Sequence, residues 1–157
     1  MEIEKLVDHI TEVNDPFMKM AVVGVEELRK LINHEVWMRK RTIVDNDYHY
    51  DEEIICTIKN VTDKEIIVEY NHEETNILLS DVMGVEDLNI NYNEKEINFK
   101  KYLNKAVKIT NHYNDSIYCV IEDVEDNTIT FGVMCRDNYY SSDLVYPKNL
   151  IRTIKEI

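Results

Sequence analysis

Alternating apolar and polar residues dominate the chain after residue 35. Runs of this kind, rich in β-branched and aromatic residues and separated by polar clusters, predict β-strands. Short strands at this spacing are typical of small barrels or sandwiches. The predicted strands cover residues 36–44, 53–61, 65–70, 75–79, 106–110, 116–124, 128–134 and 143–146.

The first 35 residues have the periodicity of helices. Apolar residues three and four positions apart predict an amphipathic helix at the start of the chain. Asp15 suits an N-cap and Pro16 suits the first helical position, so a second helix is expected to begin there. The β-branched residues around Gly24 leave a strand over residues 20–25 as the alternative. The apolar residues of the first helix are Ile3, Leu6, Val7, Ile10 and Val13.

Residues 52–70 and 115–133 form an internal repeat that aligns without a gap. Each copy has the pattern I-x-C-x-I-x-x-V-x-D, which predicts a strand, a tight acidic turn and a second strand. Because side chains alternate along a strand, Ile54, Cys56 and Ile58 share one face, as do Ile117, Cys119 and Ile121, and we expect that face to be the core. The matched pairs are Ile54 and Ile117, Cys56 and Cys119, Ile58 and Ile121, Val61 and Val124, Asp63 and Asp126, and Ile66 and Ile129.

This repeated hairpin, with the later L-L-S-D-V and P-K-N-L-I turns, resembles the Sm-like and SH3-like small β-barrels. The resemblance implies an α+β, mainly β fold, with an N-terminal helical segment followed by two repeated five-stranded SH3-like or Sm-like barrels. The expected divisions are a helical segment (1–35), a first barrel (36–88), an ordered linker with a helical turn (89–105) and a second barrel (106–157). The Asp and Asn loop motif with which Sm proteins bind RNA has no counterpart here.

Charge and cysteine usage narrow the classes of partner and compartment. The chain of 157 residues has a formal net charge of −13, and residues 36–88 carry 13 acidic and five basic side chains. Such a field repels phosphates and attracts basic surfaces. The acidic start and the lack of a long apolar run predict a cytoplasmic protein without a membrane span. Three cysteines without paired spacing agree with a reducing compartment, and only Cys135 is expected to be partly exposed.

Motifs for catalysis or cofactor binding are missing from the sequence. With three glycines, neither a phosphate-binding loop nor a dinucleotide fingerprint can be written. The five histidines have no ligand-like spacing, and the acidic loop around Asp45 lacks the glycine and the terminal glutamate of a calcium loop. We therefore predict no catalytic residues, no metal and no cofactor, and a chain that is not an enzyme.

Tyrosine-rich loops are the candidate binding residues. Tyrosine offers a large amphipathic contact surface at low entropic cost. The SH3-like resemblance implies that the loop after each first strand flanks a ligand groove, where acidic residues meet basic partners. The alternative is that these rings pack between the barrels or over their ends. The candidate partner-binding residues are Asp45, Asp47, Tyr48, His49, Tyr50, Asp51, Glu52, Tyr113, Tyr139 and Tyr140.

These observations favour a non-enzymatic acidic module that binds a protein with a basic surface. In composition, the chain is similar to small acidic proteins of phages and mobile elements, including inhibitors that occupy the nucleic-acid-binding surface of a defence enzyme. The alternatives are a small-ligand or nucleotide-binding protein that uses its aromatic loops, or an Sm-like RNA-binding module, which the net charge disfavours. We expect no direct nucleic-acid or membrane partner, and a homo-oligomer stays open.

Overall fold

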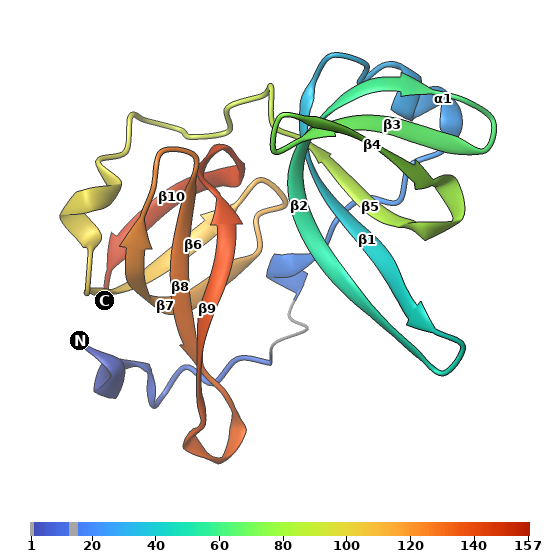
Figure 1. Ribbon diagram of the computed structural model, residues 1–157. Coiled ribbons are helices and arrows are strands. Elements are labelled where there is room, and N and C mark those ends of the chain that lie inside the picture. Colours follow the sequence, from blue (N-terminus) through green and yellow to red (C-terminus); the bar gives the residue numbers. More distant parts are fainter. Residues whose placement is uncertain (1, 13–15) are drawn as a thin grey trace. The chain divides into compact units, whose positions relative to one another are not determined.

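The computed structural model describes residues 2–12 and 16–157, and it is mainly β. The chain divides into two compact units, each built around a five-stranded antiparallel sheet (Figure 1). The β1–β5 unit comprises residues Met20–Ile90, and the β6–β10 unit comprises Met1–Lys19 with Asn91–Ile157. This confirms the mainly β fold with two sheets that the sequence predicts.

The two sheets have the same strand order. The first is ordered β4-β3-β2-β1-β5 and the second β10-β6-β7-β8-β9. Among the described residues, no strand pairing joins β4 to β5 or β9 to β10, so neither sheet closes by backbone pairing. The strands of the first sheet are β1 (Glu35–Asp45), β2 (Tyr48–Val61), β3 (Glu65–Tyr70), β4 (Glu73–Leu78) and β5 (Val82–Asp87). Those of the second are β6 (Ala106–Asn111), β7 (Ser116–Val124), β8 (Thr128–Met134), β9 (Tyr140–Pro147) and β10 (Ile151–Glu156).

The helical elements are short, and the expected N-terminal helix is replaced by a single turn. Val7 and Ile10, which the helix was predicted to bury, are exposed. Short helices are marginal without tertiary packing, and residues 7–12 instead follow the second sheet, where the Thr11 N–H donates to the Met134 carbonyl (2.7 Å). The helices are α1 (Val25–Arg29) and the 3-10 turns η1 (Ile3–Leu6), η2 (Pro16–Met18), η3 (Leu79–Asp81), η4 (Phe99–Tyr102), η5 (Arg136–Asn138) and η6 (Lys148–Leu150).

The second predicted helix was wrong in length and position. Its expected N-cap, Asp15, lies outside the described residues; one 3-10 turn starts at Pro16, and α1 begins only after Gly24. Residues 20–24 form no strand either. They instead run beside β5, where the Ala21 carbonyl accepts the Val85 N–H (2.9 Å), which satisfies the backbone without regular structure.

The repeat is present in the register of the two sheets. Ile58 lies opposite Val68, and its counterpart Ile121 lies opposite Phe131. A register shift follows at the same position in both hairpins, before Asn60 and before Asp123. The residue after the shift is held in the same way each time, because the Asn60 and Asp123 side chains accept the N–H groups of Val61 and Val124 (2.9 Å each). The equivalent hairpins therefore belong to two separate sheets with matching irregularities.

The predicted core face is confirmed in both hairpins. Ile54, Cys56 and Ile58 are buried, as are their counterparts Ile117, Cys119 and Ile121. Burial raises the pKa of the Cys56 thiol to about 12 and raises that of Cys119 as well, since a thiolate would lose its hydration in the core. Both thiols therefore act as small apolar side chains.

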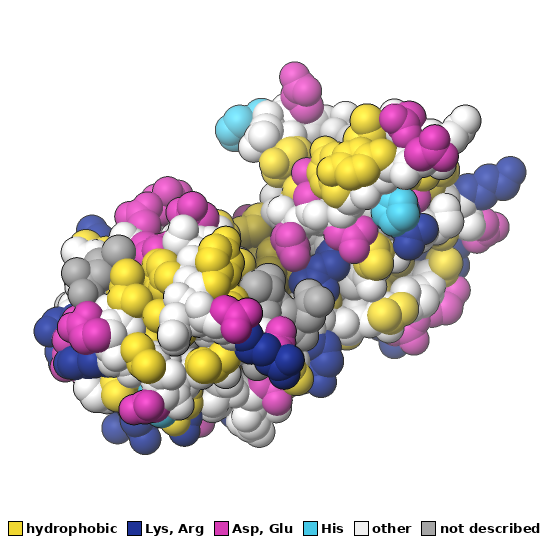
Figure 2. Space-filling model, turned by 90° about the horizontal axis from the view of Figure 1, so that it is seen from below, with side chains coloured by type: hydrophobic (Ala, Val, Ile, Leu, Met, Phe, Trp, Pro, Cys, Tyr) yellow, Lys and Arg dark blue, Asp and Glu magenta, His cyan; other side chains and the backbone are white. Residues whose placement is uncertain are grey.

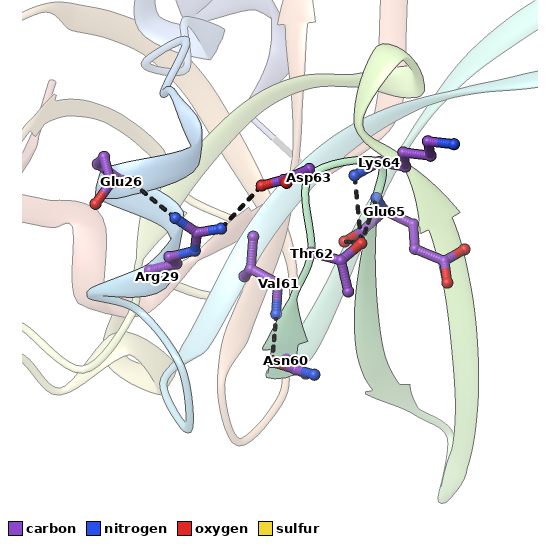
Figure 3. A network of polar contacts seen from close by, with 8 residues as sticks. All are labelled: Glu26, Arg29, Asn60, Val61, Thr62, Asp63, Lys64 and Glu65. Atoms are coloured by element: carbon purple, nitrogen blue, oxygen red, sulfur yellow. Dashed lines mark hydrogen bonds and ion pairs between the residues drawn. The ribbon is translucent and has the colours of Figure 1, made fainter.

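Polar contacts fix the turn between β2 and β3 (Figure 3). The Thr62 hydroxyl accepts the N–H groups of Lys64 (3.3 Å) and Glu65 (3.1 Å), which closes the turn. Arg29 of α1 bridges Glu26 (2.7 Å) and Asp63 (3.1 Å), so the helix is tied to the turn that carries the repeated aspartate. These exposed pairs position the turn more than they stabilise the fold.

Candidate functional site

Strands β1 and β2 continue well past the rest of their sheet. The last pair between β1 and β5 is Lys40 with Val82, and the first pair between β2 and β3 is Thr57 with Glu69. Beyond Lys40, β1 pairs only with β2 among the described residues, and the two form the projecting hairpin of Figure 1. We call residues 41–51, the outer part of this hairpin, the extension.

The β6–β10 unit makes the same connection without an extension. Thr110 pairs with Ser116, and the equivalent pair in the other unit is Arg39 with Glu53. The Asn111 side-chain oxygen accepts the N–H groups of Tyr113 and Asp115 (3.0 Å each), which closes the connection within a few residues. The extension therefore adds eight residues, since residues 41–51 replace residues 112–114. A unit of this kind folds with the short connection, so the extension is not needed to complete a sheet.

Four large apolar side chains of the extension are exposed. They are Ile43 (64%), Val44 (59%), Tyr48 (57%) and Tyr50 (41%). The Tyr48 and Tyr50 rings lie on one face of β2, with ring centroids 6.3 Å apart. A two-stranded hairpin is marginally stable in water, so these side chains are exposed on a part of the sheet that has little packing of its own. Figure 2 shows that hydrophobic side chains reach the molecular surface in groups, with Asp and Glu side chains among them.

Charged side chains pair across the stem below this apolar group. Glu53 lies opposite Arg39 and forms an ion pair with it (3.0 Å). Glu52 lies opposite Lys40, forms an ion pair with it (3.1 Å) and accepts the Thr42 hydroxyl (3.2 Å). The carboxylate of Glu52, a candidate partner-binding residue, therefore already has two partners within the hairpin.

The acidic side chains that remain exposed lie nearer the tip. Asp45 and Asp47 flank the turn, and an Asp45 side-chain oxygen accepts the Asp47 N–H (2.8 Å). Asp51 is exposed opposite Arg41, and His49 is exposed opposite Ile43. The extension carries three aspartates and one arginine, so its tip combines apolar and tyrosine side chains with net negative charge.

Tyr113 is in a different environment from the extension tyrosines. It is half-buried beside His112, with ring centroids 4.1 Å apart, and the Lys19 ammonium lies 4.6 Å from its ring centroid. The Tyr92 ring also lies beside His112, with ring centroids 5.1 Å apart. Tyr113 therefore packs against side chains of its own unit.

Tyr139 and Tyr140 differ from one another despite being adjacent. Tyr139 is 66% exposed, whereas the Tyr140 hydroxyl donates to the Glu122 carboxylate (2.9 Å). The Tyr140 ring lies directly over Gly132, where a Cβ atom would collide with it. Burial and the bond to Glu122 raise the Tyr140 pKa, so this hydroxyl stays protonated and acts as a fixed donor.

Sequence reasoning found the tyrosines and aspartates of the extension but missed Ile43 and Val44. Both fall within a predicted strand, where apolar residues are expected to be buried. Their adjacency in the sequence could have indicated exposure. Two neighbouring residues of a strand direct their side chains to opposite faces, and only one face can pack on a core.

No group of three or more His, Cys, Asp or Glu side chains among the described residues is placed to hold a metal ion. No helix in the described part of the chain is long and apolar enough to cross a membrane. Comparison with known proteins identified no matching family model, no similar curated protein and no similar solved structure.

Proposed function

We propose that this chain is a non-enzymatic, acidic protein-binding module, and that the extension contacts a basic surface of its partner. One observation carries the proposal: equivalent units make the same connection with three residues in one case and eleven in the other, and the added residues expose Ile43, Val44, Tyr48 and Tyr50. Residues that a fold does not need, and that expose apolar surface at a cost in solubility, are expected to serve binding.

The chemistry of the extension supports a basic protein as the partner. Tyrosines at the tip suit anchors that are desolvated on binding, and Asp45, Asp47 and Asp51 suit a charged rim that attracts the partner. A net charge of −13 disfavours nucleic acid as a direct ligand. The nucleic-acid-binding surface of a host defence enzyme, blocked by a phage or mobile-element inhibitor, would have the matching charge.

We also propose that the two units are SH3-like or Sm-like barrels. The shared strand order, with a helical turn between the fourth and fifth strands of each sheet (η3 and η6), supports two SH3-like or Sm-like units. The free thiols of Cys56, Cys119 and Cys135 support a reducing compartment such as the cytoplasm.

Capture of host proteins tests the proposal. Wild-type protein and the double variant Tyr48→Ala with Tyr50→Ala are each used to capture partners from a lysate. We expect a basic protein that the wild type retains and the double variant loses. Tyr139→Ala is the matched control, because Tyr139 is also an exposed tyrosine but lies in the other unit. A partner that both the wild type and the double variant retain would show that the extension is not the interface.

A further inference from the structure

One edge of β2 is open along the outer part of the hairpin. Strand β3 pairs with β2 only over residues 57–61, whereas β2 begins at Tyr48. Within the described part of the β1–β5 unit, no strand pairs with the β3-facing edge of β2 over residues 48–56. The length of this edge is that of an ordinary strand.

The direction of the backbone groups on this edge follows from the antiparallel pattern. The Ile58 N–H donates to the His34 carbonyl (3.1 Å), so the backbone groups of Ile58 face the side of β1. In an antiparallel strand, the N–H and C=O groups of one residue point to the same side of the strand, and those of the next residue point to the other side. Thr57 accordingly faces β3, where it pairs with Glu69. Every second residue before Thr57 points its backbone groups to the same side, which is the open edge. These residues are His49, Asp51, Glu53 and Ile55.

The open edge lacks three of the protections against strand addition, although it carries acidic side chains. Natural proteins guard such edges with proline, lysine or a bulge. Residues 48–56 contain no proline and no lysine. The register shift in this hairpin lies at its tip, between Ile43 and Asp45 of β1, and leaves the β2 edge regular up to Thr57.

Charge indicates what the edge would accept. Three consecutive acidic residues of β2, Asp51, Glu52 and Glu53, lie opposite three consecutive basic residues of β1 on the closed side. The basic residues are Arg41, Lys40 and Arg39. On the open side the same acids have no strand beside them within the described part of the unit. Opposite charges on neighbouring strands stabilise a sheet, and like charges destabilise it.

We propose that the open edge of β2, over residues 49–55, accepts an extended basic segment of a partner protein as an added β-strand. The proposal rests on the proposed function and specifies its mode of recognition. Backbone hydrogen bonds to the outward-facing residues supply affinity, while a basic side chain beside the exposed Asp51 supplies specificity. Symmetric addition of a second copy is disfavoured, because pairing β2 with β2 brings their acidic residues together.

The test uses synthetic peptides with the full-length protein. The probe is a peptide of about eight residues in which lysine alternates with valine, long enough to span the edge. A control peptide of the same sequence carries N-methyl groups on alternate amides, which keeps the charge but blocks strand pairing. We expect the probe to slow amide hydrogen exchange at Asp51 and Glu53, and the N-methylated peptide to bind about tenfold more weakly or worse.

A variant pair separates edge pairing from charge. Asp51→Pro removes an outward-facing N–H and leaves the ladder to β1 intact, so peptide binding should be lost. Asp51→Asn keeps the N–H and removes the same charge, so binding should weaken but persist. Hydrogen exchange of β1 shows whether each variant keeps the hairpin.

The inference is overturned by equal binding of both peptides, which means attraction by charge alone, or by exchange protection that lies away from residues 49–55. A single-stranded oligonucleotide or a second copy that protects the same amides would also overturn it. The proposed function fails separately, when Tyr48→Ala with Tyr50→Ala leaves capture of the partner unchanged. If Asp51→Pro leaves capture intact while the tyrosine variant abolishes it, strand addition is wrong and the extension remains the interface.

Discussion

Asn33 and Asn104 occupy the same position in the two sheets. Both have left-handed backbone conformations (φ 71° and 63°). The Asn33 N–H donates to the Ile58 carbonyl (2.6 Å), and the Asn104 N–H donates to the carbonyl of its counterpart Ile121 (2.7 Å). Each asparagine thus ends the helical turn that precedes the first strand and joins it to the second strand. The duplication therefore includes these entry turns as well as the strands.

The free energy of unfolding of variants at Asn33 and Asn104 should depend on how easily the new residue adopts a left-handed backbone conformation. Asn33→Gly and Asn104→Gly should change the free energy of unfolding little, because glycine adopts this conformation freely. Asn33→Val and Asn104→Val should each cost about 1–2 kcal/mol, because a β-branched side chain disfavours it. Urea unfolding measures both effects. Equal stability of the Gly and Val variants at either position would contradict this assignment.

The contact between Tyr140 and Gly132 should limit the size of residue 132. Gly132→Ala places a Cβ where the Tyr140 ring lies, so we expect a loss of about 1–3 kcal/mol of stability from overpacking. In the background of Tyr140→Ala the same glycine substitution should cost much less, because the ring is absent. A double-mutant cycle by urea unfolding measures the difference. Additive effects would show that the two residues do not interact.

The alternation of side chains made one part of the fold predictable from sequence. Ile54, Cys56 and Ile58 share a face in any strand, so the core face of β2 required no knowledge of its neighbours. The N-terminal helix could not be predicted in this way, because an apolar stripe forms a helix only where a surface can bury it. Leu6 finds such a surface, whereas Val7 and Ile10 stay exposed. The length of the extension depends on where β3 and β5 stop pairing, which local sequence does not encode.

Thiol reactivity should separate the three cysteines. Cys56 and Cys119 are buried, and their raised pKa values keep them protonated and unreactive near neutral pH. Cys135 is half-buried and should react with a thiol reagent in native buffer well before the other two. Mass spectrometry of the labelled protein over time gives the order. Simultaneous labelling of all three thiols in folded protein would show that the core faces are assigned wrongly.

The charges and the rings of the extension should act on different binding rates. Asp45→Asn with Asp47→Asn should slow association at low salt and matter less at high salt, because exposed charges are screened. Tyr48→Ala with Tyr50→Ala should speed dissociation, with a cost of about 2 kcal/mol or more if the rings are anchors. Surface plasmon resonance on the captured partner separates the two rates. The same rate constant changing in both variants would contradict the division of roles.

The central claim is that the extension binds a partner and is dispensable for folding. It is tested most directly by the affinity of the captured partner for a chain in which residues 40–52 are replaced by Asn-His-Tyr-Asn-Asp, the sequence of residues 111–115, which includes the asparagine that closes the short connection. We expect this chain to fold, because the β6–β10 unit makes the same connection with these residues, and hydrogen exchange of β1 and β2 checks this. Its affinity should fall by about a hundredfold or more, as for the loss of more than one hot-spot side chain. Unchanged affinity in the folded chimaera would contradict the claim.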